Sequence, residues 1–135
     1  MRARRLGMLG VRVLIVDDMP AVREGLRLLL GSEPDLEIVG EAGNGHDALR
    51  LTEMLHPDVV LLDIEMPGTD SLSVTREIKR HPHPPLIVAM TTYSDDQTCA
   101  QALEAGADQF IEKNISPDEV AIALRMANVR TSSST

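Results

Sequence analysis

The sequence predicts a doubly wound α/β domain, in which helices cover both faces of a five-stranded parallel sheet. Short apolar runs rich in β-branched residues recur along the chain, and segments with helical periodicity separate them. Strands and helices that alternate in this way favour a parallel sheet with right-handed crossovers. The length of 135 residues and a hydrophobic fraction of 43% fit one domain with a substantial core. We expect five helices and the strand order 2-1-3-4-5.

Five apolar runs are the expected strands: Val11–Val16, Leu36–Gly40, Asp58–Leu62, Leu86–Met90 and Gln109–Glu112. The first, third and fourth runs are almost wholly apolar, which is typical of strands buried on both faces of a parallel sheet. The second and fifth runs are more polar, which suits the two edges of the sheet.

The first two helices are predicted from apolar residues at helical spacing. The residues expected on one face of the first helix are Val22, Leu26, Leu29 and Leu30. Those expected on one face of the second helix are Ala48, Leu51 and Leu55. Asn44 precedes the second helix and is the expected N-cap.

The later helices are predicted mainly from their first residues. The third, near Ser71–Arg80, has the weakest signal. Ser94 with Gln97, and Ser116 with Glu119, match the capping box in which a hydroxyl and a side chain three residues later bond each other's backbone amides. We therefore expect these two pairs to open the fourth and fifth helices.

The amino-acid composition indicates where the protein is expected to be located and which direct partners are disfavoured. The 21 acidic and 13 basic residues give a formal net charge of −8, which disfavours direct contact with nucleic acid. One Tyr, one Phe and no Trp leave no aromatic platform for stacking bases. Cys99 is the single cysteine, so no internal disulfide forms. No apolar run approaches the roughly 18 residues of a membrane span, and we expect a cytoplasmic protein without membrane contact.

The chain divides into three expected parts. Residues 1–10 form a basic, disordered extension, and residues 11–128 form the folded domain. Residues 129–135 end in Thr-Ser-Ser-Ser-Thr and have the composition of a linker-like tail.

Polar residues stand at the ends of four of the expected strands. Asp17 and Asp18 follow the first, Asp63 the third, Thr91 the fourth and Lys113 the fifth. Open α/β sheets bind ligands at the carboxyl ends of their strands, where the strand order reverses. Three carboxylates that meet there repel one another unless a cation is present, and their oxygens suit Mg²⁺. A carboxylate beside Mg²⁺, an ammonium group and a hydroxyl is equipped to receive a phosphoryl group.

An ordered set of motifs resembles the receiver domain of two-component response regulators. The motifs are Val16-Asp17-Asp18, Leu61–Gly68 (LLDIEMPG), Thr91-Thr92, and Glu104–Asp108 (EAGAD) followed by Lys113. The resemblance covers residues 11–128 and implies a flavodoxin-like fold. The stretch Lys113–Pro117 (KNISP) is similar to receivers of LuxR-type DNA-binding regulators.

The resemblance also implies which residues bind metal and phosphate. Asp63 corresponds to the phosphoacceptor, and Asp18 to a direct Mg²⁺ ligand, while Asp17 acts mostly through water. The backbone carbonyl of Glu65 corresponds to the third protein ligand. Lys113 corresponds to the lysine that pairs with Asp63 and then with the phosphate.

Three further residues correspond to moving or access positions. Thr91 matches the switch hydroxyl that turns toward the phosphoryl group, and Phe110 matches the aromatic switch residue. Thr92 lies where a small residue lines the route to the site. Two residues depart from the family: Ser71 stands where Gly is common, and Asn114 where many members have Pro. We expect Ser71 to alter the turn before the third helix without abolishing phosphorylation.

The function implied is a phosphorelay step rather than enzymatic turnover. Asp63 would accept a phosphoryl group from a histidine kinase, and the resulting switch would promote homodimerisation or contact with an effector. Two outputs stay open: transcription through a DNA-binding domain outside this chain, or action as a stand-alone receiver by protein contact.

Two other classes are disfavoured. A Mg²⁺ phosphatase of the haloacid-dehalogenase type needs a second Asp two residues after the first, where this chain has Glu65. A receiver-like scaffold that never takes phosphate is disfavoured by the intact set of acids.

Overall fold

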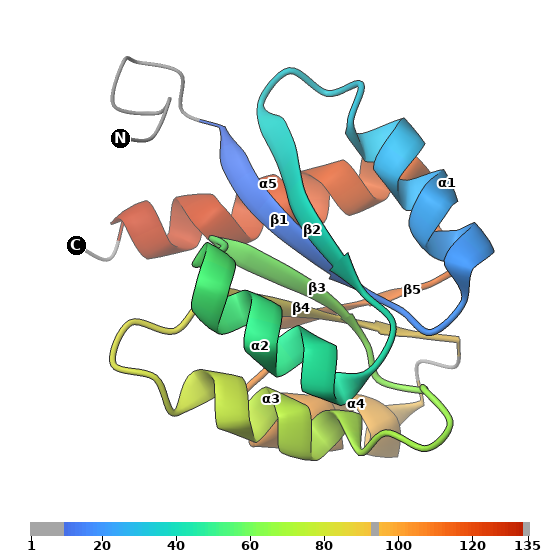
Figure 1. Ribbon diagram of the computed structural model, residues 1–135, viewed down its shortest axis with the longest axis vertical. Helices are drawn as coiled ribbons and strands as arrows, with labels where there is room; N and C mark the ends of the chain where they lie inside the picture. The colour runs from blue at the N-terminus through green and yellow to red at the C-terminus, as the bar shows by residue number, and fades with distance from the viewer. Residues whose placement is uncertain (1–9, 93–94, 134–135) are drawn as a thin grey trace.

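The computed structural model describes residues 10–92 and 95–133, and it confirms the predicted sheet (Figure 1). All five strands are parallel and lie in the order β2-β1-β3-β4-β5. Their bounds are β1 Val11–Val16, β2 Leu36–Ala42, β3 Val59–Asp63, β4 Leu86–Thr91 and β5 Gln109–Glu112. The more polar second and fifth runs form the edges, as expected.

Three strands extend further toward the site than predicted, and one of them is β2, which ends at Ala42 rather than Gly40. Asp63 and Thr91 are the last residues of β3 and β4 rather than the first residues of the following loops. Sheet pairing continues through both, since Asp63 pairs with Met90 and Thr91 pairs with Glu112. The backbone of these two polar residues is therefore fixed by the sheet.

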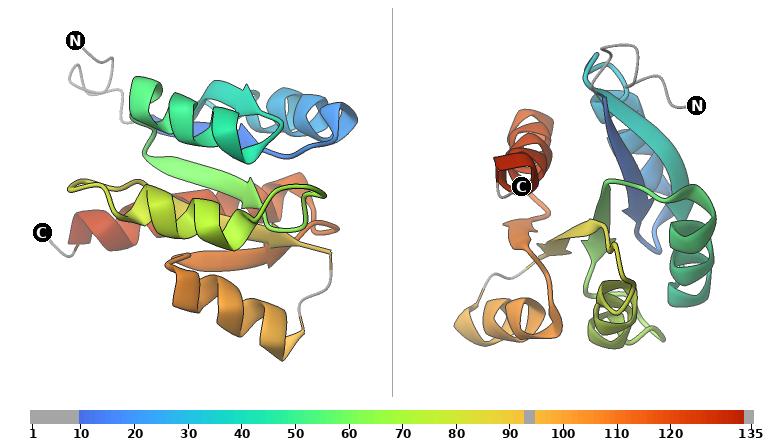
Figure 2. Two further views of the ribbon diagram at one scale, coloured as in Figure 1. Left: turned by 60° about the horizontal axis from the view of Figure 1, so that its bottom comes forward. Right: turned by 90° about the vertical axis from the view of Figure 1, so that its left-hand side faces the viewer.

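The helices cover both faces of the sheet (Figure 2). Their bounds are α1 Pro20–Leu30, α2 Gly45–Leu55, α3 Ser71–Lys79, α4 Asp96–Ala105 and α5 Pro117–Ser133. Helices α1 and α5 lie on one face, and α2, α3 and α4 lie on the other (Figures 1 and 2). Among the described helices, none is both long and apolar enough to cross a bilayer.

Helix caps follow the predictions at α2 and α5 and differ from the prediction at α4. Asn44 Oδ1 accepts the Asp47 N–H at 2.8 Å, and Ser116 Oγ accepts the Glu119 N–H at 3.2 Å. The cap predicted for α4, Ser94, lies outside the described residues. The helix opens instead from Asp95, whose carboxylate accepts the Thr98 N–H at 2.7 Å. A carboxylate is a strong N-cap because it also opposes the positive end of the helix dipole.

Two predictions about helices α1 and α5 need correction. Leu29 was expected on the buried face of α1, but it is 52% exposed, whereas Leu30 is fully buried. The buried face follows the i, i+4, i+8 spacing of Val22, Leu26 and Leu30, from which Leu29 is rotated by one position. Helix α5 runs to Ser133, so helical hydrogen bonding continues through 129–133, the segment predicted to be linker-like. Composition alone missed this, because an established helix extends through Ser and Thr at small cost.

Side chains that point alternately to the two faces of the sheet divide the core into two layers. Val13 and Ile15 of β1 pack in the layer beneath α1 and α5, with Leu30 and Leu124. Leu14 and Val16 pack in the layer beneath α2, α3 and α4. Successive side chains of a strand point to opposite faces, so a sheet covered on both sides gives nearly continuous apolar runs.

Candidate functional site

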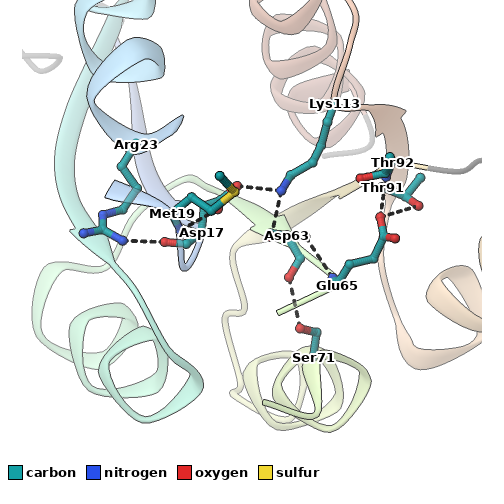
Figure 3. A network of polar contacts seen from close by, with 9 residues as sticks. All are labelled: Asp17, Met19, Arg23, Asp63, Glu65, Ser71, Thr91, Thr92 and Lys113. Atoms are coloured by element: carbon teal, nitrogen blue, oxygen red, sulfur yellow. Dashed lines mark hydrogen bonds and ion pairs between the residues drawn. The ribbon is translucent and has the colours of Figure 1, made fainter. Parts of the chain in front are cut away.

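The sheet topology places Asp17, Asp63, Thr91 and Lys113 together at the carboxyl ends of the strands (Figure 3). Asp17 follows β1, Asp63 ends β3, Thr91 ends β4 and Lys113 follows β5. Their backbones are tied across the sheet: Asp17 N–H donates to the Ala42 carbonyl at 3.0 Å, and Lys113 N–H donates to the Thr91 carbonyl at 2.8 Å. The site is therefore built on the ends of paired strands and on the residues that directly follow them.

Lys113 bridges two buried carboxylates. Its Nζ lies 2.9 Å from Asp63 Oδ2 and 3.0 Å from Asp17 Oδ2 (Figure 3). Both aspartates have no exposed surface. Burial raises the pKa of Asp63 above its usual value, and the hydrogen bond from Lys113 offsets part of that rise. Burial opposes the charge on Lys113, but the hydrogen bond to Asp63 and the ion pair with Asp17 outweigh burial and raise the pKa of Lys113. Lys113 is therefore charged at neutral pH.

The second oxygen of each carboxylate is held by a backbone amide two residues further on. Asp17 Oδ1 accepts the Met19 N–H at 2.9 Å, and Asp63 Oδ1 accepts the Glu65 N–H at 2.8 Å. These bonds fix the rotation of both carboxylates, so that each presents Oδ2 to Lys113. Charge-assisted bonds of this kind are strong and directional.

The acidic residues fit a hard cation. Asp17, Asp18 and Asp63 each offer a carboxylate oxygen, and these oxygens all lie within 4.8 Å of one another. Within the described part of the chain, buried Asp17 Oδ2 has only the ion pair with Lys113 and no aligned hydrogen bond. Mg²⁺ prefers oxygen ligands and usually retains several waters, which suits Asp18, the most accessible of the three.

Arg23 of α1 supports the acidic loop, and the sequence-based reasoning did not identify it. Its Nη1 donates to the backbone carbonyl of Asp17 at 2.6 Å, and its Nε lies 3.5 Å from Glu41. Gly43 makes room for this side chain, since a Cβ there would lie 3.0 Å from Arg23 Nη1. Arg23 stands six residues after Asp17, and no local pattern in the sequence marks it as a site residue.

Thr91 is at the site, but its hydroxyl is bonded to Glu65. Thr91 Oγ1 donates to Glu65 Oε1 at 3.0 Å, and the Thr92 N–H binds the same oxygen (Figure 3). Sequence reasoning assigned only the backbone carbonyl of Glu65 and missed this use of its side chain. Phe110, the other expected switch residue, is half-buried in β5 and packs against the core layer beneath α2, α3 and α4.

Ser71, one of the two departures from the family pattern, contacts the phosphoacceptor position directly. Its side chain is buried, and Oγ donates to the backbone carbonyl of Asp63 at 3.0 Å (Figure 3). Thr75 Oγ1 in turn donates to the Ser71 carbonyl at 2.8 Å. The hydroxyl thus ties the first residue of α3 to the end of β3. Asn114, the other departure, is exposed in the turn after Lys113, and nothing in the structure explains its replacing Pro.

The arrangement and the sequence agree with one known family. Residues 13–125 match the response regulator receiver domain. The chain belongs to that family. Asp17, Asp18 and Asp63 of this receiver accordingly form the acidic cluster that is typical of the Mg²⁺ site of the family.

Relatives with different names contain a segment similar to this receiver. The transcriptional regulatory protein LiaR of Bacillus subtilis is 39% identical over 118 residues, which are 87% of this chain and 56% of LiaR. A protein-glutamate methylesterase/protein-glutamine glutaminase of Alkalilimnicola ehrlichii is 42% identical over 104 residues, covering 76% of this chain and 27% of that protein. The receiver therefore spans about half the length of the first relative and about a quarter of the second.

A solved structure supports the LuxR-type branch that the sequence predicts. The crystal structure of a two-component response regulator of the LuxR family from an Aurantimonas species has a TM-score of 0.83 and 32% identity. The alignment covers 89% of this chain and 86% of that one. The predicted resemblance to LuxR-type receivers is confirmed.

Proposed function

We propose that this receiver accepts one phosphoryl group on Asp63 from a phosphohistidine of a sensor histidine kinase and then changes conformation. The observation that carries the proposal is the position of Asp63, buried at the end of β3 with Lys113 Nζ at 2.9 Å and within reach of two other carboxylates. A nucleophilic carboxylate, a fixed ammonium group and a cation site are the components that phosphoryl transfer requires.

Each residue has a specific role in the proposed transfer. Asp17, Asp18, Asp63 and the backbone carbonyl of Glu65 would hold Mg²⁺, which when bound neutralises charge on the phosphoryl oxygens. A carboxylate oxygen of Asp63 forms the new bond to phosphorus as the bond to the histidine nitrogen breaks, and that nitrogen takes a proton. Lys113, positioned beside Asp63, pairs with the added negative charge.

The proposed switch involves Thr91 and Phe110. The hydroxyl of Thr91 leaves Glu65 and donates to the phosphoryl group, and Phe110 moves inward from its half-buried position. Helices α4 and α5 flank β5 and expose large apolar side chains, namely Leu103, Ile122 and Met126. An apolar surface beside a switch element suits a homodimer contact or an effector, and we assign the output to this region.

The output is proposed to be transcription, carried out by a DNA-binding domain outside this chain. Support comes from LiaR, a transcriptional regulatory protein, and from the structural similarity to a LuxR-family regulator. The acidic balance of this chain disfavours DNA contact by the receiver itself. The methylesterase relative shows that other outputs accompany similar receivers, so action by protein contact alone stays the alternative. A cytoplasmic location also stays a prediction.

A phosphatase with an Asp nucleophile is the less favoured function. Such an enzyme needs a general acid two residues after the nucleophile, where Glu65 stands. The Glu65 side chain instead accepts hydrogen bonds from Thr91 and Thr92. We therefore expect stoichiometric phosphorylation and no turnover of a generic substrate such as p-nitrophenyl phosphate.

Labelling with acetyl phosphate and Mg²⁺ tests the proposal. Intact-mass spectrometry should show the addition of one phosphoryl group to the wild type and none to Asp63→Ala. The matched control Asp118→Asn, which changes an exposed acid on α5, should label as the wild type does. An unlabelled wild type that also shows no NMR shifts with beryllofluoride and Mg²⁺ would refute the assignment. Continued release of phosphate from p-nitrophenyl phosphate would favour the phosphatase instead.

A further inference from the structure

The side chain of Glu65 holds the end of β4 through one oxygen. Oε1 accepts the hydroxyl of Thr91 at 3.0 Å and also the backbone N–H of Thr92 (Figure 3). Glu65 itself is placed by its own N–H, which donates to Asp63 Oδ1 at 2.8 Å. A short chain of hydrogen bonds therefore connects the phosphoacceptor to the switch hydroxyl by way of Glu65.

The backbone around Thr91 is held on both sides of β4. Ile64 N–H donates to the Met90 carbonyl at 3.0 Å, and Lys113 N–H donates to the Thr91 carbonyl at 2.8 Å. With the strand fixed, the hydroxyl of Thr91 changes direction by rotation about χ1, which has three staggered wells. Reorientation of this hydroxyl is therefore a side-chain event that leaves the sheet pairing intact.

A threonine hydroxyl carries a single proton, so it donates one hydrogen bond at a time. The proton that binds Glu65 Oε1 is thus withheld from any acceptor attached to Asp63. A carboxylate acceptor makes the bond stronger than a neutral acceptor would. Glu65 and the phosphoryl group are competitors for the same donor.

We propose that Glu65 is a positioning residue that holds the Thr91 hydroxyl away from Asp63 in the unphosphorylated receiver and so opposes the switch. The inference rests on the proposed function, because it assumes that Thr91 turns toward a group on Asp63. It adds that the side chain two residues after the phosphoacceptor sets how readily that turn occurs. Loss of the Glu65 acceptor shifts the equilibrium toward the turned conformation before any phosphate is present.

Affinity for beryllofluoride, with Mg²⁺ in excess, gives the first readout. Glu65→Ala removes the acceptor, and we expect its dissociation constant to fall about fivefold, as the loss of one competing hydrogen bond predicts. Glu65→Gln removes the charge but keeps the side-chain oxygen, and its affinity should stay within about twofold of the wild type. The comparison separates loss of the acceptor from loss of negative charge beside an anion.

A double-mutant cycle assigns the effect to Thr91. In a Thr91→Val background the hydroxyl is absent, so Glu65→Ala should change the dissociation constant by less than about twofold. A second readout needs neither metal nor beryllofluoride. Three-bond couplings to the Thr91 methyl group report its χ1 populations by NMR, and Glu65→Ala should redistribute them while Glu65→Gln should not.

Each outcome decides the proposal. A fivefold gain in Glu65→Ala that disappears without the Thr91 hydroxyl supports it, together with an altered Thr91 rotamer. An equal gain in Glu65→Gln, or a gain that persists in the Thr91→Val background, overturns it in favour of charge alone. Unchanged Thr91 couplings in Glu65→Ala overturn it as well. A wild type that binds no beryllofluoride refutes the proposed function instead, and the couplings still decide the role of Glu65.

Discussion

Replacing Ser71 with alanine removes a buried hydroxyl that ties α3 to the strand carrying Asp63. The residue is 3% exposed, and its Oγ lies 3.0 Å from the Asp63 carbonyl oxygen. Removing the donor of a buried hydrogen bond costs about 1–3 kcal/mol. Alanine has a better helix propensity than serine, and this difference offsets the cost by about 0.5 kcal/mol at most. We therefore expect Ser71→Ala to lower the free energy of unfolding by about 0.5–2.5 kcal/mol, which corresponds to a fall of roughly 5 °C in the melting temperature.

Urea unfolding followed by far-UV circular dichroism measures this loss, since the chain has one Tyr and no Trp for fluorescence. Ser73→Ala is the matched control: Ser73 lies in the same helix, is exposed, and donates its hydroxyl to Asp70 at 2.7 Å. Ser73→Ala should lower the free energy of unfolding by no more than about 0.5 kcal/mol. If Ser71→Ala proves no more destabilising than Ser73→Ala, the hydroxyl does not tie α3 to β3. Ser71→Ala should still be labelled on Asp63, because the carboxylate keeps its contacts with Lys113 and Glu65.

Three other predictions concern Mg²⁺, an ion pair between α3 and the residue before β5, and stability in acid. Titration with MgCl₂ should raise the melting temperature of the wild type. At an Mg²⁺ concentration about a hundred times the dissociation constant, the stabilisation should be about 2.7 kcal/mol. An equal rise in Asp17→Asn would contradict the proposed Mg²⁺ site. Lys79 Nζ lies 2.9 Å from Asp108, so Lys79→Met should cost about 1 kcal/mol in urea unfolding, and a neutral result would discount this ion pair. The hydrogen bond from Arg125 lowers the pKa of Asp35. The pair therefore contributes its whole stabilisation above the ordinary aspartate pKa of about 4. This stabilisation is lost as the pH falls through the lowered pKa of Asp35. A double-mutant cycle of Arg125→Ala and Asp35→Asn should show a coupling of about 0.5–1 kcal/mol at neutral pH that vanishes in acid, and a coupling independent of pH would count against it.

Much of the fold could be predicted because buried parallel strands leave a strong signal. β1 and β5 have the bounds expected from their apolar runs. The convergence of Asp17, Asp63 and Lys113 followed from the rule that parallel strands end at one edge. These features depend on strand order and on residue type at strand ends, both of which the sequence displays.

The features that escaped prediction depend on side-chain direction. Glu65 was expected to contribute its backbone carbonyl, but which way its side chain turns depends on where Thr91 and Thr92 lie across the sheet. Ser71 was recognised as a departure, yet its bond to the Asp63 carbonyl depends on the path of the turn between them. Arg23 reaches the acidic loop from a different helix. Contacts of this kind are tertiary, and no local pattern encodes them.

The separation of the core into two layers has a consequence for how such a receiver diversifies. Val13 and Ile15 belong to the core layer beneath α1 and α5, while Leu14 and Val16 belong to the layer beneath α2, α3 and α4. Because the sheet separates them, substitutions that reshape one layer leave the packing of the other largely undisturbed, and their energetic effects should add. Over evolutionary time, the side chains of one layer can therefore change while the other layer keeps its packing.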